Sequence, residues 1–222
     1  MKLPIWLSWS SGKDSAWALH TLRQDPAIDV RALLTTVNET HDRVAMHAVR
    51  RDLLRAQARA LGVALEMVDI PYPCANEQYE AAMTAAIDRA RAQGIREVAF
   101  GDLYLEDIRA WREERMAPTG LGTRFPIWGI PTDELARQML AAGLRAVITC
   151  VDPRKVPAEW AGREWNAELL AELPAGVDPC GENGEFHTFV FDGPGFGAPL
   201  PVQVGEVVER DGFVFADVVL SA

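Results

Sequence analysis

Short apolar runs alternate with longer amphipathic segments through the first hundred residues. The apolar runs have the length and composition of buried strands, and the segments between them have helical periodicity. The strand-like runs are Leu3–Trp9, Val30–Val37, Ala64–Ile70 and Glu97–Gly101, and the helical segments between them are about 16–24, 44–61 and 77–93. Strands separated by helices of this length predict a parallel sheet with right-handed crossovers and helices on both faces.

The second half of the chain is less regular. Its pattern predicts a helix over 102–115, a short strand over 125–130, a helix over 132–142 and a strand over 145–151. Residues 152–179 combine prolines with short helical patterns, which favours a cover built largely from loops. Strand-like segments 203–209 and 213–220 then flank Arg210-Asp211-Gly212, which predicts a β-hairpin with an Asp-Gly turn.

These patterns place the chain in the α/β class. We predict a doubly wound parallel sheet within residues 1–151 and a C-terminal α+β region, residues 152–222, that ends in the β-hairpin. A length of 222 residues can bury the core that such an arrangement needs. In parallel sheets ligands bind beyond the C-terminal ends of the strands, so the loop after the first strand is the first place to look for a site.

The loop Ser10–Ser15 (SSGKDS) joins the first strand to a helix. The start of a helix has unpaired N–H groups and the positive end of the helix dipole, so it attracts anions such as phosphate. Gly12 lets the backbone approach a ligand, Lys13 has a positive charge, and the serines can donate hydrogen bonds. The loop predicts a nucleotide phosphate site, with an ordinary capped helix start as the alternative. A Walker-type loop is excluded because Leu7 stands where that motif requires glycine.

A second polar loop, Cys180–Thr188 (CGENGEFHT), lies between the cover and the hairpin. Glu182 and Glu185 could orient an amine or a metal ion, and His187 could transfer a proton near neutral pH. A turn-rich surface loop, with Asn183-Gly184 as a hairpin turn, is the alternative interpretation.

Together the two loops carry a resemblance to a known family. SxGKDS resembles the PP-loop of the ATP pyrophosphatases, usually SGGKDS, with Ser11 in place of the usual glycine. CGENGEFHT is similar to the second signature of the diphthine–ammonia ligases, a branch of that family, and follows the first motif at a similar distance of about 170 residues. The pair Gly101-Asp102, with Arg109 and Glu113, is similar to a further family segment, and Met46-His47 to a Met-Phe-His element.

One position departs from this family pattern. The family often has a second arginine two positions after the first, whereas this chain has Trp111 there and its next arginine is Arg112. The role of Arg112 is therefore left open by the resemblance.

The resemblance implies a HUP-type (adenine nucleotide α-hydrolase-like) fold that cleaves ATP to AMP and pyrophosphate. A carboxylate would be adenylated, and ammonia or an amine would displace AMP to form an amide. ATP and Mg²⁺ are the implied cofactors. Lys13 and Asp14 are the implied catalytic residues, and Asp14 is also the candidate Mg²⁺ ligand.

The other implied residues fall into two groups. The ATP-binding group is Ser10, Ser11, Gly12, Lys13, Asp14, Ser15, Thr36, Gly101 and Asp102. The substrate-binding group is His47, Arg109, Glu113, Glu182, Asn183, Gly184, Glu185, His187 and Thr188. The substrate would be a small-molecule or protein-borne carboxylate, in the family diphthine on a translation elongation factor, and a homodimer is compatible with this interpretation. Only three of the 22 basic residues are lysine, which hints at a GC-rich bacterial genome and hence at another substrate.

Two other functions, one of them enzymatic and one from a different class, compete with the ligase. A PP-loop tRNA-modifying enzyme is disfavoured by the net charge of −10, which argues against a broad nucleic-acid surface, and by the absence of a CxxC pair among the three cysteines. An ATP-binding protein of the universal-stress type would share the fold without the chemistry. The chain has no apolar run of about twenty residues and no signal-peptide pattern, so we expect no membrane partner and a cytoplasmic location.

Overall fold

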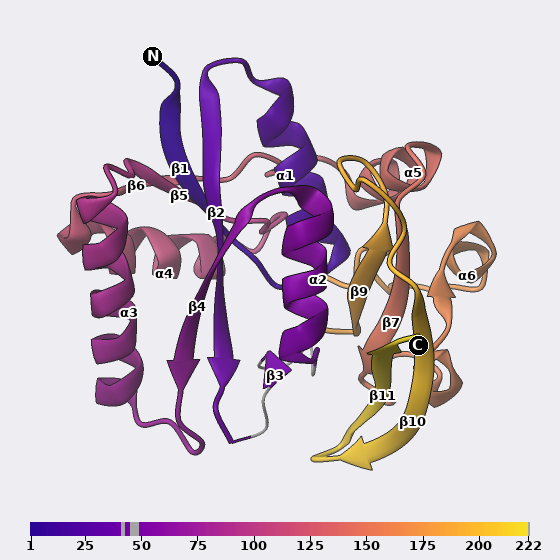
Figure 1. The fold of residues 1–222 in the computed structure, drawn as a ribbon. Coiled ribbons are helices and arrows are strands. Elements are labelled where there is room, and N and C mark those ends of the chain that lie inside the picture. Colours follow the sequence, from indigo (N-terminus) through magenta and orange to yellow (C-terminus); the bar gives the residue numbers. More distant parts are fainter. Residues whose placement is uncertain (41–42, 45–48, 222) are drawn as a thin grey trace.

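The computed structural model describes residues 1–40, 43–44 and 49–221 and contains two sheets (Figure 1). Sheet A has the strand order β3-β2-β1-β5-β6, and β4 pairs with β2 on the side opposite β1 and β3. All its pairings are parallel except the short antiparallel one between β2 and β3. Its strands are β1 (Leu3–Ser8), β2 (Ile28–Asn38), β3 (Arg43–Val44), β4 (Ala64–Ile70), β5 (Glu97–Ala99) and β6 (Gly122–Arg124). The predicted α/β class with a mostly parallel sheet is confirmed.

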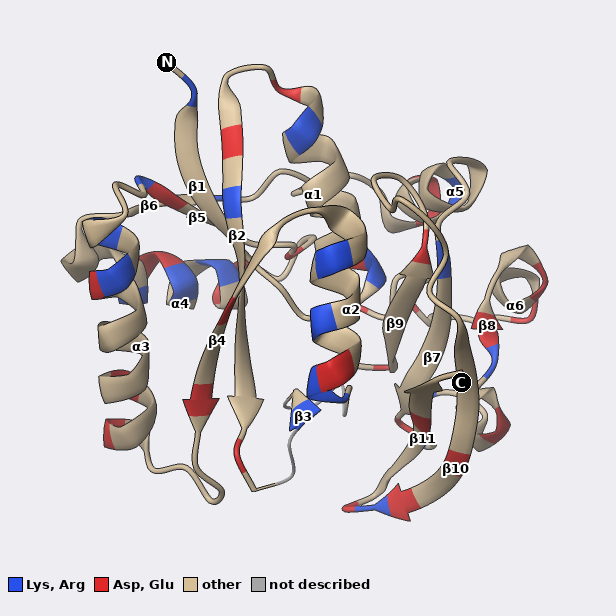
Figure 2. Ribbon diagram, in the orientation of Figure 1, with Lys and Arg blue, Asp and Glu red and all other residues tan. Residues whose placement is uncertain are grey.

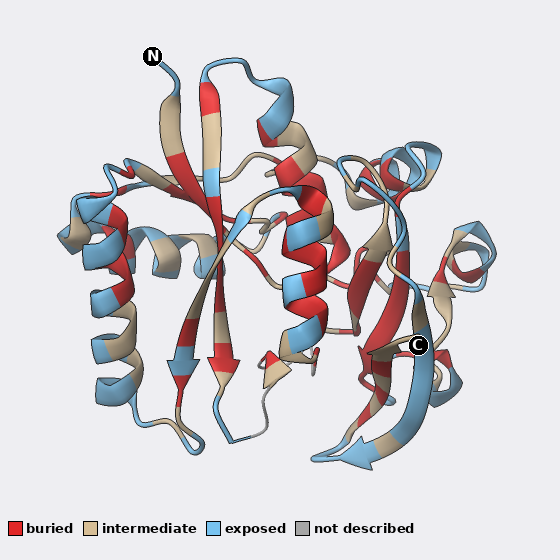
Figure 3. Ribbon diagram, in the orientation of Figure 1, coloured by how far each residue is buried: buried red, intermediate tan, exposed pale blue. Residues whose placement is uncertain are grey.

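Helices cover both faces of sheet A and create two hydrophobic cores (Figure 1). They are α1 (Lys13–Gln24) and α2 (Arg51–Leu61) on one face, and α3 (Asn76–Ala92) and α4 (Glu106–Met116) on the other. Successive residues of β1 point to opposite faces, so Ile5 and Leu7 join the core under α1 and α2 while Trp6 joins the core under α3. The middle of β1, Ile5–Leu7, is consequently buried from both faces, and its other residues are partly buried (Figure 3).

Sheet B is antiparallel and lies beyond α1 and α2 (Figure 1). Its order is β10-β11-β7-β8, and β9 pairs with the other side of β7. The strands are β7 (Arg145–Val151), β8 (Glu164–Trp165), β9 (Phe186–Asp192), β10 (Val202–Arg210) and β11 (Phe213–Leu220). The remaining elements are α5 (Thr132–Ala141), α6 (Ala167–Ala171) and the 3₁₀ turns η1 (Ala117–Thr119) and η2 (Ala158–Trp160).

The C-terminal hairpin predicted from the sequence is confirmed. β10 and β11 pair from Val202↔Leu220 to Arg210↔Phe213. Asp211 and Gly212 have φ angles of 53° and 79°, as the tight turn of a hairpin requires.

Strand β7 lies in a different sheet from the one its sequence suggests. The pattern places the apolar run Arg145–Val151 within the N-terminal region, but the strand pairs only with strands of sheet B. Six of its seven residues are buried, because the strand is central in sheet B. A strand covered on both faces has the same continuous apolar run as a strand of a parallel sheet, so pattern alone does not separate the two.

Three predicted elements have different bounds. The helix predicted over 44–61 begins at Arg51, because Val44 pairs with Val37 of β2 instead. The strand predicted over 125–130 is a turn in which Gly129 has a φ angle of 75°, and the last strand of sheet A is β6, just before it. The helix predicted from Asp102 begins only at Glu106.

Within the described part of the chain, no helix combines the length and the apolar character needed to cross a membrane.

Candidate functional site

The loop between β1 and α1 is held by its own serines. The Ser10 and Ser15 hydroxyl oxygens lie 3.2 Å apart, and the N–H of Gly12 donates to the Ser10 hydroxyl at 3.3 Å. The Ser15 hydroxyl donates to the Gly12 carbonyl at 2.9 Å. Gly12 is the N-cap of α1 and has an extended backbone. The start of α1 is thereby kept at the C-terminal end of β1, where the sequence predicts an anion site.

Ser11 explains why this loop usually has glycine at its second position. Its φ angle of 73° lies in the left-handed region, which side chains other than glycine enter at a cost. Its carbonyl accepts hydrogen bonds at 3.0 Å from the side chain of Gln57 and from the N–H of Val190. The conformation is therefore held by α2 and β9, two elements distant in sequence.

A cavity of about 830 Å³ opens beside this loop. It lies over the C-terminal ends of β1, β2 and β5 and between α3 and α4, which is where a parallel sheet binds ligands. Its lining includes Ser10, Thr36, Tyr79, Phe100, Trp111 and Arg112. Of the predicted ATP-binding residues, Ser10 and Thr36 face this cavity directly.

Two arginines of α4 line the cavity: Arg115, which pairs with Glu80 at 2.6 Å, and Arg112. The Arg112 guanidinium forms two hydrogen bonds to the Asp102 carboxylate, at 2.6 and 3.0 Å, and lies 4.6 Å from the centre of the Phe100 ring. Arg109, the residue indicated by the family pattern, instead pairs with Glu113 at 2.9 Å on the partly exposed side of α4. The sequence leaves Arg112 open, and the only signal for it is its place one position after the expected second arginine.

The second polar loop folds into a compact turn. The N–H of Gly184 donates to the Gly181 carbonyl at 3.0 Å, and Asn183 donates to a carboxylate oxygen of Glu185 at 3.1 Å. Gly181 has a φ angle of 70°, and a Cβ there would lie 2.8 Å from the Phe186 carbonyl oxygen, so only glycine fits. Glu185 is buried, whereas Asn183 is exposed.

The structure brings the two loops together. The N–H of Lys13 donates to the Thr188 hydroxyl at 3.1 Å, and the Lys13 ammonium donates to the carbonyl of Cys180. Glu182 accepts a hydrogen bond at 2.8 Å from the N–H of Leu103, next to Asp102. Residues from both predicted groups therefore meet at the start of α1.

Burial shifts the titration of several groups at this junction. It raises the pKa of Glu182 to about 7, although the Leu103 N–H partly opposes the shift. Burial and the nearby charge of Lys13 lower the pKa of His187 to about 4, so its imidazole is neutral at pH 7. Burial alone would lower the pKa of Lys13, but the nearby acidic groups, Asp14 above all, together outweigh it and raise that pKa. A protonated Lys13 and a neutral His187 are the states expected at neutral pH.

Buried polar atoms at the first loop are suited to a ligand. Among the described residues the Ser11 hydroxyl oxygen and Asp14 Oδ1 are buried without a hydrogen-bond partner, a state that is costly unless a ligand or ion satisfies it. The part of the chain that the structure describes has no group of three or more His, Cys, Asp or Glu side chains that could bind a metal ion. A magnesium ion here would therefore share its ligands between Asp14 and nucleotide phosphates.

His47, also predicted to bind substrate, lies outside the described residues. Gly101 packs against the backbone of α1 at Asp14 and Ser15.

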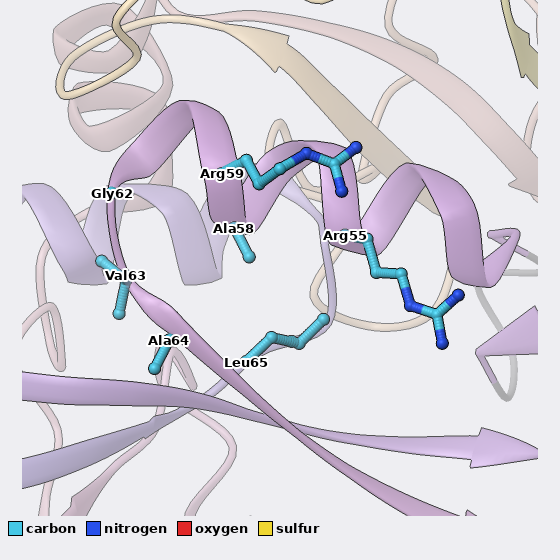
Figure 4. A pocket seen from close by; sticks show the side chains of 7 residues that line it. All are labelled: Arg55, Ala58, Arg59, Gly62, Val63, Ala64 and Leu65. Atoms are coloured by element: carbon cyan, nitrogen blue, oxygen red, sulfur yellow. The ribbon is translucent and has the colours of Figure 1, made fainter.

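A separate shallow pocket of about 380 Å³ lies at the end of α2 (Figure 4), between Arg55, Arg59 and the first residues of β4. It contains none of the predicted site residues. Figure 2 shows several blue Lys or Arg segments along α2.

Family models cover almost the whole chain. The diphthamide synthase N-terminal domain matches residues 4–122, and the diphthamide synthase C-terminal domain matches residues 131–216. The chain belongs to the diphthamide synthase family. The first match contains most of sheet A with the loop Ser10–Ser15, and the second contains most of sheet B with the Cys180–Thr188 turn, so the two loops that meet at Lys13 come from the two family domains.

A curated relative points the same way over a shorter stretch. The diphthine–ammonia ligase of Rattus norvegicus is 32% identical over 97 residues, which are 41% of this chain and 36% of that protein. The chain thus matches little more than a third of the relative's length.

Proposed function

We propose that this member of the diphthamide synthase family is an ATP-dependent ligase that forms a carbon–nitrogen bond. A carboxylate oxygen of the acceptor attacks the α-phosphorus of ATP, the bond to the β-phosphate breaks and pyrophosphate leaves. Ammonia or an amine then attacks the activated carbonyl carbon, AMP leaves, and the nitrogen loses a proton to give the amide. The acceptor is a small-molecule or protein-borne carboxylate.

The observation that carries this proposal is the cavity of about 830 Å³ beside the first loop. Its volume falls in the range of small-molecule sites, and the N-terminus of α1 supplies N–H donors and a positive dipole end for phosphate. Thr36 and Phe100 provide a surface for the base and ribose, and Ser10 stands at the phosphate end.

Arg112 is the positioned cation of this site. The Asp102 carboxylate and the Phe100 ring orient its guanidinium, so little conformational entropy is lost when it pairs with an anionic group of the substrate. Asp14 Oδ1, buried and unpaired, would bind Mg²⁺. When bound, Mg²⁺ neutralises the charge that develops on the leaving pyrophosphate.

The proposal is tested by incubating the protein with Mg²⁺-ATP, ammonium and a metabolite extract, and separating the nucleotides. AMP and pyrophosphate are the expected products. ADP and phosphate would contradict cleavage between the α and β phosphates, and binding without turnover in any extract would favour a nucleotide-binding protein. Isotopically labelled ammonium identifies the amidated acceptor by its mass.

A further inference from the structure

The side chain of Lys13 points away from the nucleotide cavity. Only 2% of it is exposed, and it is absent from the lining of the cavity. Its ammonium contacts the Cys180 carbonyl and Asp14 Oδ2, the latter at 2.9 Å. The rings of Trp165 and Phe186 lie 5.8 and 5.5 Å from the ammonium.

These contacts compensate for the burial of the charge. A buried ammonium loses its hydration, and a carbonyl, a carboxylate and two ring faces replace water here. Moving the ammonium into the cavity would break both hydrogen bonds and leave the Asp14 carboxylate without its cation. The arrangement therefore favours Lys13 staying where it is when a nucleotide binds.

We propose that Lys13 is a positioning residue for the turn Cys180–Glu185 and for Asp14, and that it does not bind the phosphates of ATP. This role in catalysis rests on the proposed function, in which the N–H groups of α1, Ser10 and Arg112 bind the phosphates of ATP. Lys13 bonds to one oxygen of Asp14 and leaves the other, Oδ1, unpaired. The same ammonium fixes the backbone of the turn that contains Glu182.

A second lysine gives a matched control. Lys155 donates to the Asn183 carbonyl of the same turn at 2.6 Å, but from the exposed side. Lys13 and Lys155 thus make the same type of bond to neighbouring peptide groups in different surroundings. A buried hydrogen bond of a charged group is worth more than an exposed one, so their removal should have unequal effects.

The experiment compares K13M with K155M by amide hydrogen exchange over Cys180–Glu185. We expect exchange in the turn to accelerate about tenfold or more in K13M and less than about threefold in K155M. K13R retains the charge and donors and should restore most of the protection. If K13M does not fold, K13Q, which is shorter and still polar, provides the same comparison.

Nucleotide affinity provides the second readout. Measured without Mg²⁺, so that Asp14 does not contribute, K13M should bind ATP and AMP with the same affinity ratio as the unsubstituted protein, within about threefold, because a lost phosphate contact would weaken ATP selectively. A loss of ATP affinity of about thirtyfold with AMP unaffected would overturn the proposal, as would unchanged exchange in the turn. Should the unsubstituted protein bind neither nucleotide, the proposed function fails, while the exchange comparison still tests the position of Lys13.

Discussion

A Cβ atom on Gly101 would lie 3.1 Å from the backbone nitrogen of Ser15. It would lie equally close, at 3.1 Å, to the carbonyl carbon of Asp14. Both contacts are with backbone at the start of α1, which has little freedom to move. The segment after β5 can therefore approach the start of α1 this closely only because Gly101 has no side chain.

Gly101→Ala is accordingly expected to displace the first turn of α1. Overpacking of this kind costs about 1–3 kcal/mol, which urea unfolding can measure, and ATP affinity should fall with it. Gly197→Ala is the control, because its nearest neighbour, the Ala60 carbonyl oxygen, would lie at an ordinary 3.5 Å. Equal stability of the two variants would contradict the tight packing at Gly101.

Ser11→Gly is expected to stabilise the fold by about 1 kcal/mol. Glycine adopts the left-handed φ of 73° without strain, and the change removes a buried hydroxyl that has no partner among the described residues. The greater freedom of glycine in the unfolded chain offsets part of the gain. Thermal unfolding measures the change, with Ser10→Gly, which lacks a positive φ, as a control that should be destabilised. A lower melting temperature for Ser11→Gly would contradict the strain at this position.

Arg112→Ala is expected to reduce ATP affinity by about 10- to 100-fold, the effect of losing a charge-assisted hydrogen bond to an anion. Arg109→Ala should change it less than about threefold, because Arg109 pairs with Glu113 on the partly exposed side of α4. Both variants remove one arginine from one helix, so calorimetric titration compares them at equal net charge. A larger loss for Arg109 would restore the assignment that the family pattern favours.

Asp217 links the C-terminal hairpin to the other sheet. It accepts hydrogen bonds from Arg43 at 2.8 Å and from Arg50 at 2.5 and 3.0 Å. Burial alone would raise the pKa of Asp217, but these arginines outweigh it and lower the pKa to about 2. β11 is thereby tied to β3 and to the residue before α2, a contact that the hairpin sequence does not reveal.

Asp217→Asn should destabilise the protein by about 1 kcal/mol at pH 7, since the ion pairs are only partly buried. The folded pKa lies below the unfolded value of 3.8, so this stability is present above about pH 4 and is lost as pH falls toward 2. The difference between the two proteins in urea unfolding should vanish over that range. Asp88→Asn on the exposed side of α3 serves as the control, and a difference that persists at pH 2 would contradict the ion-pair mechanism.

Local patterns are sufficient to predict most strands of sheet A and the position of the loop Ser10–Ser15. Strand, glycine-containing loop and helix follow one another within the 22 residues Leu3–Gln24, and the helix start provides the N–H groups on which the predicted anion site depends. The Asp-Gly hairpin turn is equally local. Its backbone angles depend on residues that are adjacent in the sequence.

The resemblance to a known family links the loops Ser10–Ser15 and Cys180–Thr188 through their motifs alone. It does not indicate how they meet, because the contacts of Lys13 with Cys180 and Thr188 join residues more than 160 positions apart. The same limit applies to α4: helical spacing places Arg109 and Arg112 on one helix, and only packing against Asp102 and Phe100 distinguishes them.

The sequence by itself therefore determined the α/β class, the strand–loop–helix unit on which the predicted anion site rests, and the family, since these depend on short-range backbone chemistry and on motifs. The tertiary structure alone decided that β7 belongs to sheet B, that Arg112 lines the cavity and that the Lys13 ammonium faces the second loop. The physical reason is common to all three. Strand partners and side-chain directions are set by contacts between distant segments, and periodicity along the chain does not specify which segments those are.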